Sequence, residues 1–164
     1  MSEAAAAPPM EVAFIGLGAM GLPMAARLLG AGFIVRGSDR AAAARDSFAA
    51  AGGEAFATAR DACQGVAVVI TMLPNGAIVR DVLLGADGAA RALAPGALVI
   101  DMSSSAPMAT RALAADLDAL GIALIDAPVS GGVRRAADGS LAIMAGGDAG
   151  QIERARPLFE AMGK

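Results

Sequence analysis

The chain has 164 residues, a formal net charge of −3, 56% hydrophobic residues and 3% aromatic residues. Its length suits one domain, and its net negative charge argues against binding nucleic acid or acidic membranes. Histidine is absent and Cys63 is the only cysteine. These facts exclude histidine catalysis, zinc sites of the usual kind and an intrachain disulfide. The lone cysteine fits the reducing cytoplasm, where we expect the protein to act.

Residues 1–10 are expected to form a disordered tail. This segment is rich in alanine and proline and has no cationic region ahead of an apolar run, so it does not look like a signal peptide. Residues 11–164 are expected to form one dinucleotide-binding domain. Their uncharged runs are interrupted by glycine, proline and polar residues, and they are short for membrane spans.

Short apolar segments alternate with helical segments along the predicted domain. The expected strands are 12–15, 33–38, 66–72, 97–101, 122–125 and 141–145. A first helix follows the glycines after residue 15, and further helices are expected at 41–51, 75–84, 107–120 and 149–162. This order predicts an α/β fold of Rossmann type, a doubly wound and mostly parallel sheet with helices on both faces. The link between the last two strands has no predicted helix, so we expect an antiparallel strand near the C-terminal end.

A glycine-rich turn joins the first strand to the first helix. In the pattern Gly-x-Gly-x-x-Gly, Gly16 would permit a tight turn and Gly18 would let a pyrophosphate approach the backbone. Gly21 would let the helix pack closely on the strand. Unpaired N–H groups and the helix dipole would then hold phosphates. The predicted cofactor-binding turn comprises Gly16, Leu17, Gly18, Ala19, Met20 and Gly21. The alternative is a tight turn that binds nothing.

Asp39 stands at the end of the second predicted strand. A carboxylate there can accept both ribose hydroxyls of NAD and repels the 2′-phosphate of NADP. Arg36 and Arg40 flank it and could meet a phosphate, so the sequence favours NAD without excluding NADP. Asp39 and Arg40 are therefore predicted to bind the cofactor. A role for Asp39 as the N-cap of the helix at 41–51 is an alternative that is compatible with ribose binding.

Four segments resemble the β-hydroxyacid dehydrogenases, the family of 3-hydroxyisobutyrate dehydrogenase, tartronate semialdehyde reductase and 6-phosphogluconate dehydrogenase. They are FIGLGAMGLPM at 14–24, MLPN at 72–75, DMSSSAP at 101–107 and DAPVSGG at 126–132. The resemblance implies the NAD-binding part of an oxidoreductase that moves a hydride between a nicotinamide cofactor and a small hydroxy acid. Acids of the 3-hydroxyisobutyrate, tartronate semialdehyde or threonate type are the expected substrates.

The resemblance also implies roles for single residues. On the cofactor side these are Leu73, Pro74, Ile78 and Ser104, and on the substrate side they are Ser130, Gly131 and Gly132. A hydroxyl and free backbone N–H groups in the second set can hold a carboxylate, although an ordinary turn would have the same sequence. Arg134 and Arg135 depart from the family pattern. They could contact an anionic group on a larger substrate or be solvated loop residues.

The family's general acid/base is a lysine in a later Gly-x-x-Gly-x-Gly-x-x-x-Lys segment, ahead of an all-helical domain. Lys164, the one lysine of this chain, does not match it. We therefore expect no catalytic residue here, no turnover by this chain alone, and homo-oligomers for the complete enzyme. Two other interpretations stay open. One is a stand-alone nucleotide-binding module without catalysis, and the other is the N-terminal domain of an imine-reductase-like enzyme.

Overall fold

The computed structural model describes residues 9–164, and its centre is a six-stranded parallel sheet. The strands are β1 (Glu11–Ile15), β2 (Ile34–Ser38), β3 (Glu54–Phe56), β4 (Val68–Thr71), β5 (Leu98–Asp101) and β6 (Ala123–Asp126). They lie side by side in the order β3-β2-β1-β4-β5-β6. The order reverses between β1 and β4, so a crevice opens there at the carboxyl ends of the strands. The predicted fold class is confirmed.

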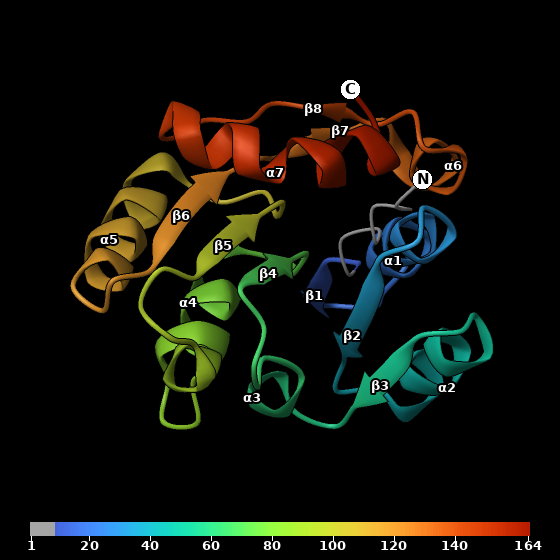
Figure 1. Ribbon diagram of the computed structural model, residues 1–164, viewed down its shortest axis with the longest axis horizontal. Coiled ribbons are helices and arrows are strands. Elements are labelled where there is room, and N and C mark those ends of the chain that lie inside the picture. Colours follow the sequence, from blue (N-terminus) through green and yellow to red (C-terminus); the bar gives the residue numbers. More distant parts are fainter. Residues whose placement is uncertain (1–8) are drawn as a thin grey trace, which may run out of the picture.

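Helices cover both faces of this sheet (Figure 1). They are α1 (Gly21–Gly30), α2 (Ala42–Ala50), α3 (Ala59–Ala62), α4 (Gly76–Leu84), α5 (Pro107–Asp118), α6 (Gly132–Asp138), α7 (Ala149–Met162) and the 3-10 helix η1 (Ala89–Ala92). One core cluster joins β1 and β4 to α1, α2 and α7. A second cluster joins the opposite side of the same strands to α3, α4 and α5. The two clusters make the domain a three-layer sandwich.

The alternating pleat of the strands explains how one sequence supplies both clusters. In β1, Val12 and Phe14 pack in the first cluster, whereas Ala13 and Ile15 pack in the second. All residues of β4 are buried, because a central parallel strand is covered on both faces. Phe48 of α2 fills the space beside Gly37, where an added Cβ would lie 2.4 Å from the phenyl ring. A glycine in β2 is thus what lets α2 pack on the sheet.

A small second sheet lies near the C-terminal end. It pairs β7 (Val129–Ser130) with β8 (Ala142–Ile143) in antiparallel register. The predicted antiparallel strand is therefore confirmed, but the expectation of a link without a helix is wrong, because α6 connects the two strands. Gly131 and Gly132, with φ of 138° and 71°, turn the chain into α6, and Gly139, with φ of 74°, ends it. These left-handed positions need glycine.

The structure adjusts several predicted boundaries. β3 and α3 lie in a segment where no element was predicted. The helix expected over 107–120 ends at Asp118, and Leu120 is 50% exposed. Most of the predicted tail, residues 1–8, lies outside the described residues. Met10 belongs to the domain, because its carbonyl accepts a hydrogen bond from Ile34 N–H and its side chain packs on the core. Within residues 9–164, no helix is long and apolar enough to cross a membrane.

Candidate functional site

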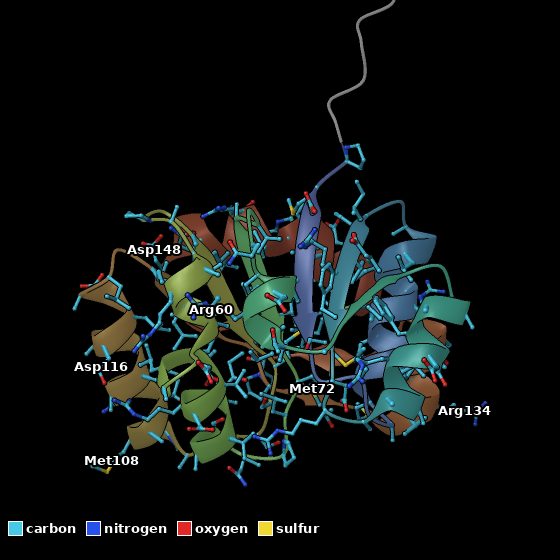
Figure 2. All side chains as sticks on the ribbon, turned by 90° about the horizontal axis from the view of Figure 1, so that it is seen from below. Arg60, Met72, Met108, Asp116, Arg134 and Asp148 are labelled. Atoms are coloured by element: carbon cyan, nitrogen blue, oxygen red, sulfur yellow. The ribbon has the colours of Figure 1, made fainter. Side chains whose placement is uncertain are left out.

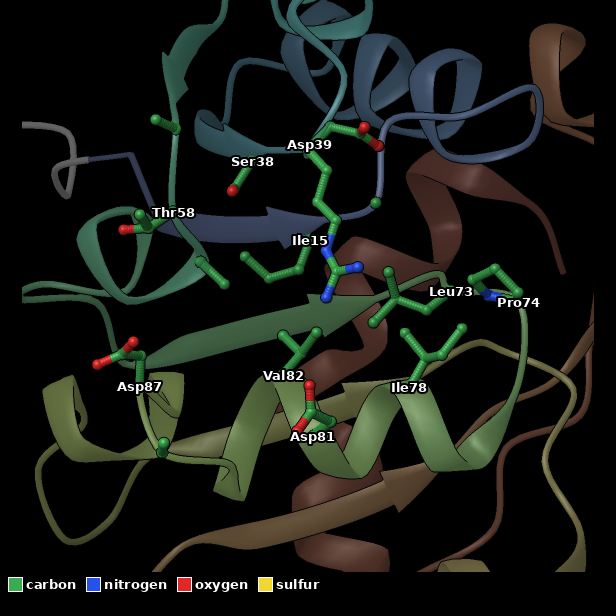
Figure 3. Close-up of a pocket in the computed structure, with 15 residues that line it drawn as sticks. Ile15, Ser38, Asp39, Thr58, Leu73, Pro74, Ile78, Asp81, Val82 and Asp87 are labelled. Carbon is green, nitrogen blue, oxygen red and sulfur yellow. The ribbon is translucent and has the colours of Figure 1, made fainter.

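A cavity of about 660 Å³ opens at the carboxyl ends of β1 and β2. Its lining residues are Ile15, Gly16, Ser38, Asp39, Arg40, Ala57, Thr58, Ala59, Leu73, Pro74, Ile78, Asp81, Val82, Ala86 and Asp87. Figure 3 shows Ile78 and Val82 pointing from α4 toward Ile15, with Asp39 on the opposite side. The floor is therefore apolar and the rim is polar, which is the usual character of a small-molecule site.

Each glycine of the turn after β1 has a different steric environment. Gly16 has φ of 103°, and an added Cβ would lie 2.1 Å from the carbonyl oxygen of Met72. At Gly21 an added Cβ would lie 1.8 Å from the carbonyl oxygen of Gly16, so the start of α1 packs directly on the turn. At Gly18 an added Cβ would meet nothing within 4 Å. Gly16 and Gly21 are thus required by the fold itself, and Gly18 is not.

The same turn exposes unpaired hydrogen-bond donors. Within residues 9–164, no protein acceptor pairs with the backbone N–H groups of Gly18, Ala19 or Met20. Gly18 and Ala19 are exposed, and α1 begins immediately after these residues with the positive end of its dipole. A pyrophosphate fits this donor set, because its oxygens need donors and the open space at Gly18 lets them reach the backbone.

Asp39 connects the end of β2 to this turn. Its Oδ2 accepts a hydrogen bond from Leu17 N–H at 2.8 Å, and its Oδ1 accepts one from Ala41 N–H at 2.8 Å. The N-cap of α2 is Ala41, without a side-chain cap, so the N-cap alternative for Asp39 is wrong. A carboxylate oxygen can accept more than one hydrogen bond, so both oxygens keep capacity for ribose hydroxyls in the cavity.

Arg36 has a structural position that the sequence did not predict. Its guanidinium donates to the carbonyl oxygens of Ala62 at 3.0 Å and Asp61 at 3.1 Å, and it pairs with Glu11. It also lies 4.4 Å above the ring of Phe56. These contacts commit Arg36 to packing β2 against α3, so its proposed contact with a 2′-phosphate is withdrawn. Arg40 does line the cavity beside Asp39.

Leu73, Pro74 and Ile78, which the resemblance assigns to the cofactor side, line this cavity. Two hydrogen bonds hold this wall. Asn75 caps α4 by accepting from Ile78 N–H at 3.0 Å, and Ser103 Oγ accepts from Leu73 N–H at 2.8 Å. Ser103 was not predicted as a site residue. The segment DMSSSAP contained the signal, because three consecutive serines follow a strand end, but the sequence does not tell which serine turns inward.

The remaining predicted residues lie outside this cavity. Ser104 is exposed after β5, and Ser130, Gly131 and Gly132 are exposed at the junction of β7 and α6. Figure 2 shows Arg134 toward the same lower end of the molecule as Met72, which follows β4. The description of Arg134 and Arg135 as loop residues is corrected, since both lie in α6, although both are exposed.

The carboxyl ends of β5 and β6 place two acidic residues next to each other. Asp101 pairs in register with Asp126 across the parallel strands. Burial raises the pKa of Asp126 above its usual range, and the neighbouring charge of Asp101 raises it further. Two carboxyl groups thus lie side by side at the carboxyl ends of β5 and β6.

Residues 11–164 match the family model described as the NAD binding domain of 6-phosphogluconate dehydrogenase. The chain belongs to this family. The resemblance seen in four sequence segments is therefore confirmed. The chain is an N-terminal NAD-binding domain of the β-hydroxyacid dehydrogenase family. The predicted cofactor, NAD, agrees with the family's description.

Individual relatives share the sequence and the fold of this domain. The NAD-dependent L-serine dehydrogenase of Pseudomonas aeruginosa is 49% identical over 154 residues, which are 94% of this chain and 52% of that protein. A solved structure of Mycobacterium tuberculosis 3-hydroxyisobutyrate dehydrogenase with L-serine has a TM-score of 0.90 at 44% identity, over 94% of this chain and 52% of that one. Streptomyces aurantiacus imine reductase has a TM-score of 0.84 at 28% identity, over 93% of this chain and 53% of that one. The NAD-binding domain spans about half the length of the curated relatives it matches.

Proposed function

We propose that this domain binds NAD across the carboxyl ends of β1 and β2. The observation that carries the proposal is the contact between Asp39 and the backbone N–H of Leu17, which joins the ribose-reading carboxylate to the glycine turn. The pyrophosphate would lie on the N–H groups of Gly18, Ala19 and Met20. The adenosine half would occupy the cavity between Asp39 and α4.

We further propose that NAD is preferred over NADP. A 2′-phosphate at Asp39 would place two negative charges together, and the repulsion is strong where solvent is partly excluded. Arg36 cannot offset it, because Ala62, Asp61 and Glu11 already take its donors. Arg40, unlike Arg36, lines the cavity. We assign it a contact with the face or edge of the adenosine.

For the complete protein we propose oxidation and reduction of small 3-hydroxy acids. The names of two relatives contain L-serine or 3-hydroxyisobutyrate, both of which carry a hydroxyl on the carbon β to a carboxylate. NAD supplies the hydride chemistry when it is bound. Ser130, Gly131 and Gly132 would hold the substrate carboxylate through a hydroxyl and backbone N–H groups. No residue of this chain is assigned as the general acid/base.

A calorimetric titration with NADH and NADPH tests the cofactor proposal. Wild type should bind NADH more tightly than NADPH. Asp39→Ala should weaken NADH binding by about a hundredfold, because it removes two charge-assisted hydrogen bonds of about 1.5 kcal/mol each, and it should reduce the preference for NADH.

Asp46→Ala, an exposed aspartate on α2 outside the cavity, is the matched control and should bind both cofactors as wild type does. Equal NADH affinity in wild type and Asp39→Ala would refute the ribose role. For the complete protein, activity on cyclic imines with none on hydroxy acids would refute the substrate class.

A further inference from the structure

Asp101 is a buried carboxylate at the end of β5. It is 1% exposed, and among the buried residues of the described chain it is the one that carries a charge. The polar residues around it, Thr71 and Ser103, are both fully buried. Such a group is costly to place in a protein interior unless its hydrogen bonds are satisfied.

Three neutral donors satisfy this carboxylate. Its Oδ1 accepts from Thr71 Oγ1 at 3.0 Å and from the backbone N–H of Ser103 at 3.0 Å. Its Oδ2 accepts from Ser105 Oγ at 3.1 Å. Within residues 9–164, no buried side-chain oxygen or nitrogen lacks a partner. The network around Asp101 is therefore complete.

These contacts link the loop after β5 to the segment 73–76, of which Leu73 and Pro74 line the cavity. Ser103, whose backbone is held by Asp101, accepts the N–H of Leu73 at 2.8 Å. Ser105, whose hydroxyl is held by Asp101, packs on the first residue of α4, where a Cβ added to Gly76 would lie 3.3 Å from Ser105 Oγ. Asp101 thus holds both ends of the segment 73–76 through the loop after β5.

An apolar residue at this position would leave the Thr71 hydroxyl, the Ser103 N–H and the Ser105 hydroxyl without this acceptor. A buried donor left unpaired costs about 1–3 kcal/mol. The carboxylate is present although Asp126 lies beside it in the sheet register. The carboxylate of Asp101 is best explained by the positions in which it holds Ser103 and Ser105.

We propose that Asp101 is a positioning residue for the cofactor site. Through Ser103 and Ser105 it fixes Leu73 and Pro74 as a rigid wall of the cavity, so that the wall is formed before the cofactor arrives. The inference rests on the proposed binding of NAD in this cavity. The proposed role depends on the hydrogen bonds of Asp101 and not on its charge, so a variant that keeps the hydrogen bonds and removes the charge tests it.

Asn at position 101 separates geometry from charge. In Asp101→Asn the amide oxygen can still accept from Thr71 and from Ser103 N–H, and the amide nitrogen can donate to Ser105 Oγ, whose hydroxyl rotates. Asp101→Ala removes all three contacts. Ser103→Ala removes the acceptor for Leu73 N–H and the longer hydrogen bond that Ser103 Oγ donates to the Thr71 carbonyl oxygen at 3.5 Å, and it replaces Asp101→Ala in the test if that variant does not fold.

Two readouts are measured on the full chain. The first is hydrogen exchange of the Leu73 amide, which needs no cofactor. The second is the dissociation constant for NADH, measured well below the unfolding midpoint of each variant. Asp101→Ala and Ser103→Ala should each accelerate exchange at Leu73 and raise the NADH dissociation constant about fivefold or more, the effect of about one lost hydrogen bond. Asp101→Asn should remain close to wild type in both.

Leu158→Ala is the stability control, because Leu158 is a residue of α7 that is buried in the core and lies outside the cavity. It should lower the unfolding midpoint and leave both readouts unchanged. The inference is overturned if Ser103→Ala exchanges and binds as wild type does, or if Leu158→Ala weakens NADH binding equally. If wild type itself binds no NADH, the proposed function fails, whereas the exchange readout still decides whether Asp101 fixes Leu73.

Discussion

At the residue scale, the glycines of the cofactor turn differ in what a methyl group would meet. At Gly21 it would collide with the carbonyl oxygen of Gly16, so Gly21→Ala should lower the free energy of unfolding by about 1–3 kcal/mol. At Gly18 it would meet open space, so Gly18→Ala should retain stability and weaken NADH binding, since the methyl occupies the path of the pyrophosphate. Urea denaturation and NADH titration of both variants measure these effects.

Gly30 provides the matched control on the same helix. An added Cβ there has nothing within 4 Å, and Gly30 is not among the glycines with positive φ. Gly30→Ala should therefore keep both stability and NADH affinity, or raise stability slightly. Tight NADH binding by Gly18→Ala would contradict the assigned path of the pyrophosphate.

Cys63 gives the free energy of unfolding a dependence on alkaline pH. Burial raises the pKa of its thiol from 9.0 to about 12, partly opposed by the charge of Arg36. Between these values the unfolded chain loses the thiol proton and the folded chain keeps it. The unfolded state then binds fewer protons, so stability should fall as pH rises from about 9 toward 12.

Urea denaturation at several alkaline pH values measures this fall, and Cys63→Ala should flatten it. The chain suits the experiment because it has no tyrosine, which would titrate in the same range. An unchanged slope in Cys63→Ala would assign the effect to other groups.

The positions of single residues in the cavity were predictable where the signal is local in sequence. Asp39 follows a strand at the right distance from the glycines, and its carboxylate does lie in the cavity. The position of Arg36, which was only an alternative partner for a phosphate, was not predictable because its partners, Glu11, Asp61 and Ala62, come from other segments. The contact of Leu73 with Ser103 spans 30 positions, and such pairing is decided by the sheet register.

At the scale of elements, the N-cap of α4 shapes the cavity wall. Asn75 Oδ1 accepts from Ile78 N–H, and Ile78 lines the cavity. Asn75→Ala should lower the free energy of unfolding by about 1 kcal/mol and raise the dissociation constant for NADH, because the first turn of α4 loses its cap. Urea denaturation and calorimetry measure the two effects.

Asn75→Asp is the control, since aspartate caps a helix as well as asparagine does. It should restore most of the stability lost in Asn75→Ala. Equal losses in the two variants would show that the amide, and not the cap, is what α4 requires.

The missed elements are those whose formation depends on neighbours. β3 has three residues and pairs with β2 alone, and α3 has four residues, fewer than an isolated helix needs. Thr58 starts α3 by accepting from Asp61 N–H, but threonine before a charged residue is common outside helices. The strands β1, β4 and β5 were predictable, because continuous apolar runs indicate buried strands.

At the scale of the whole molecule, the cofactor cavity lacks a lysine. Lys164 lines a separate cavity of about 370 Å³ with Arg135, Ser140 and Leu141. We therefore expect the 164-residue chain to bind NADH but to form none from NAD with L-serine or 3-hydroxyisobutyrate. Absorbance at the NADH band, followed with the purified chain, measures this.

Loss of the same band when tartronate semialdehyde and NADH are supplied tests the reverse direction and should also be negative. A hydroxy-acid-dependent rise of NADH with this chain alone would show that a base lies within it. That result would require a new assignment of the proton acceptor.

The all-parallel main sheet also sets how the domain reaches its folded state. Its strands contain no hairpin, and neighbours such as Val12 and Val68 are distant along the chain. Domains of this kind fold slowly, because distant segments must lose chain entropy to come together before their contacts stabilise the fold. The cavity takes its walls from β1, β2 and the segment after β4, so it exists only in the completed sheet. NAD in the cell would thus act as a folding ligand, shifting the equilibrium of the whole domain toward the native state by mass action.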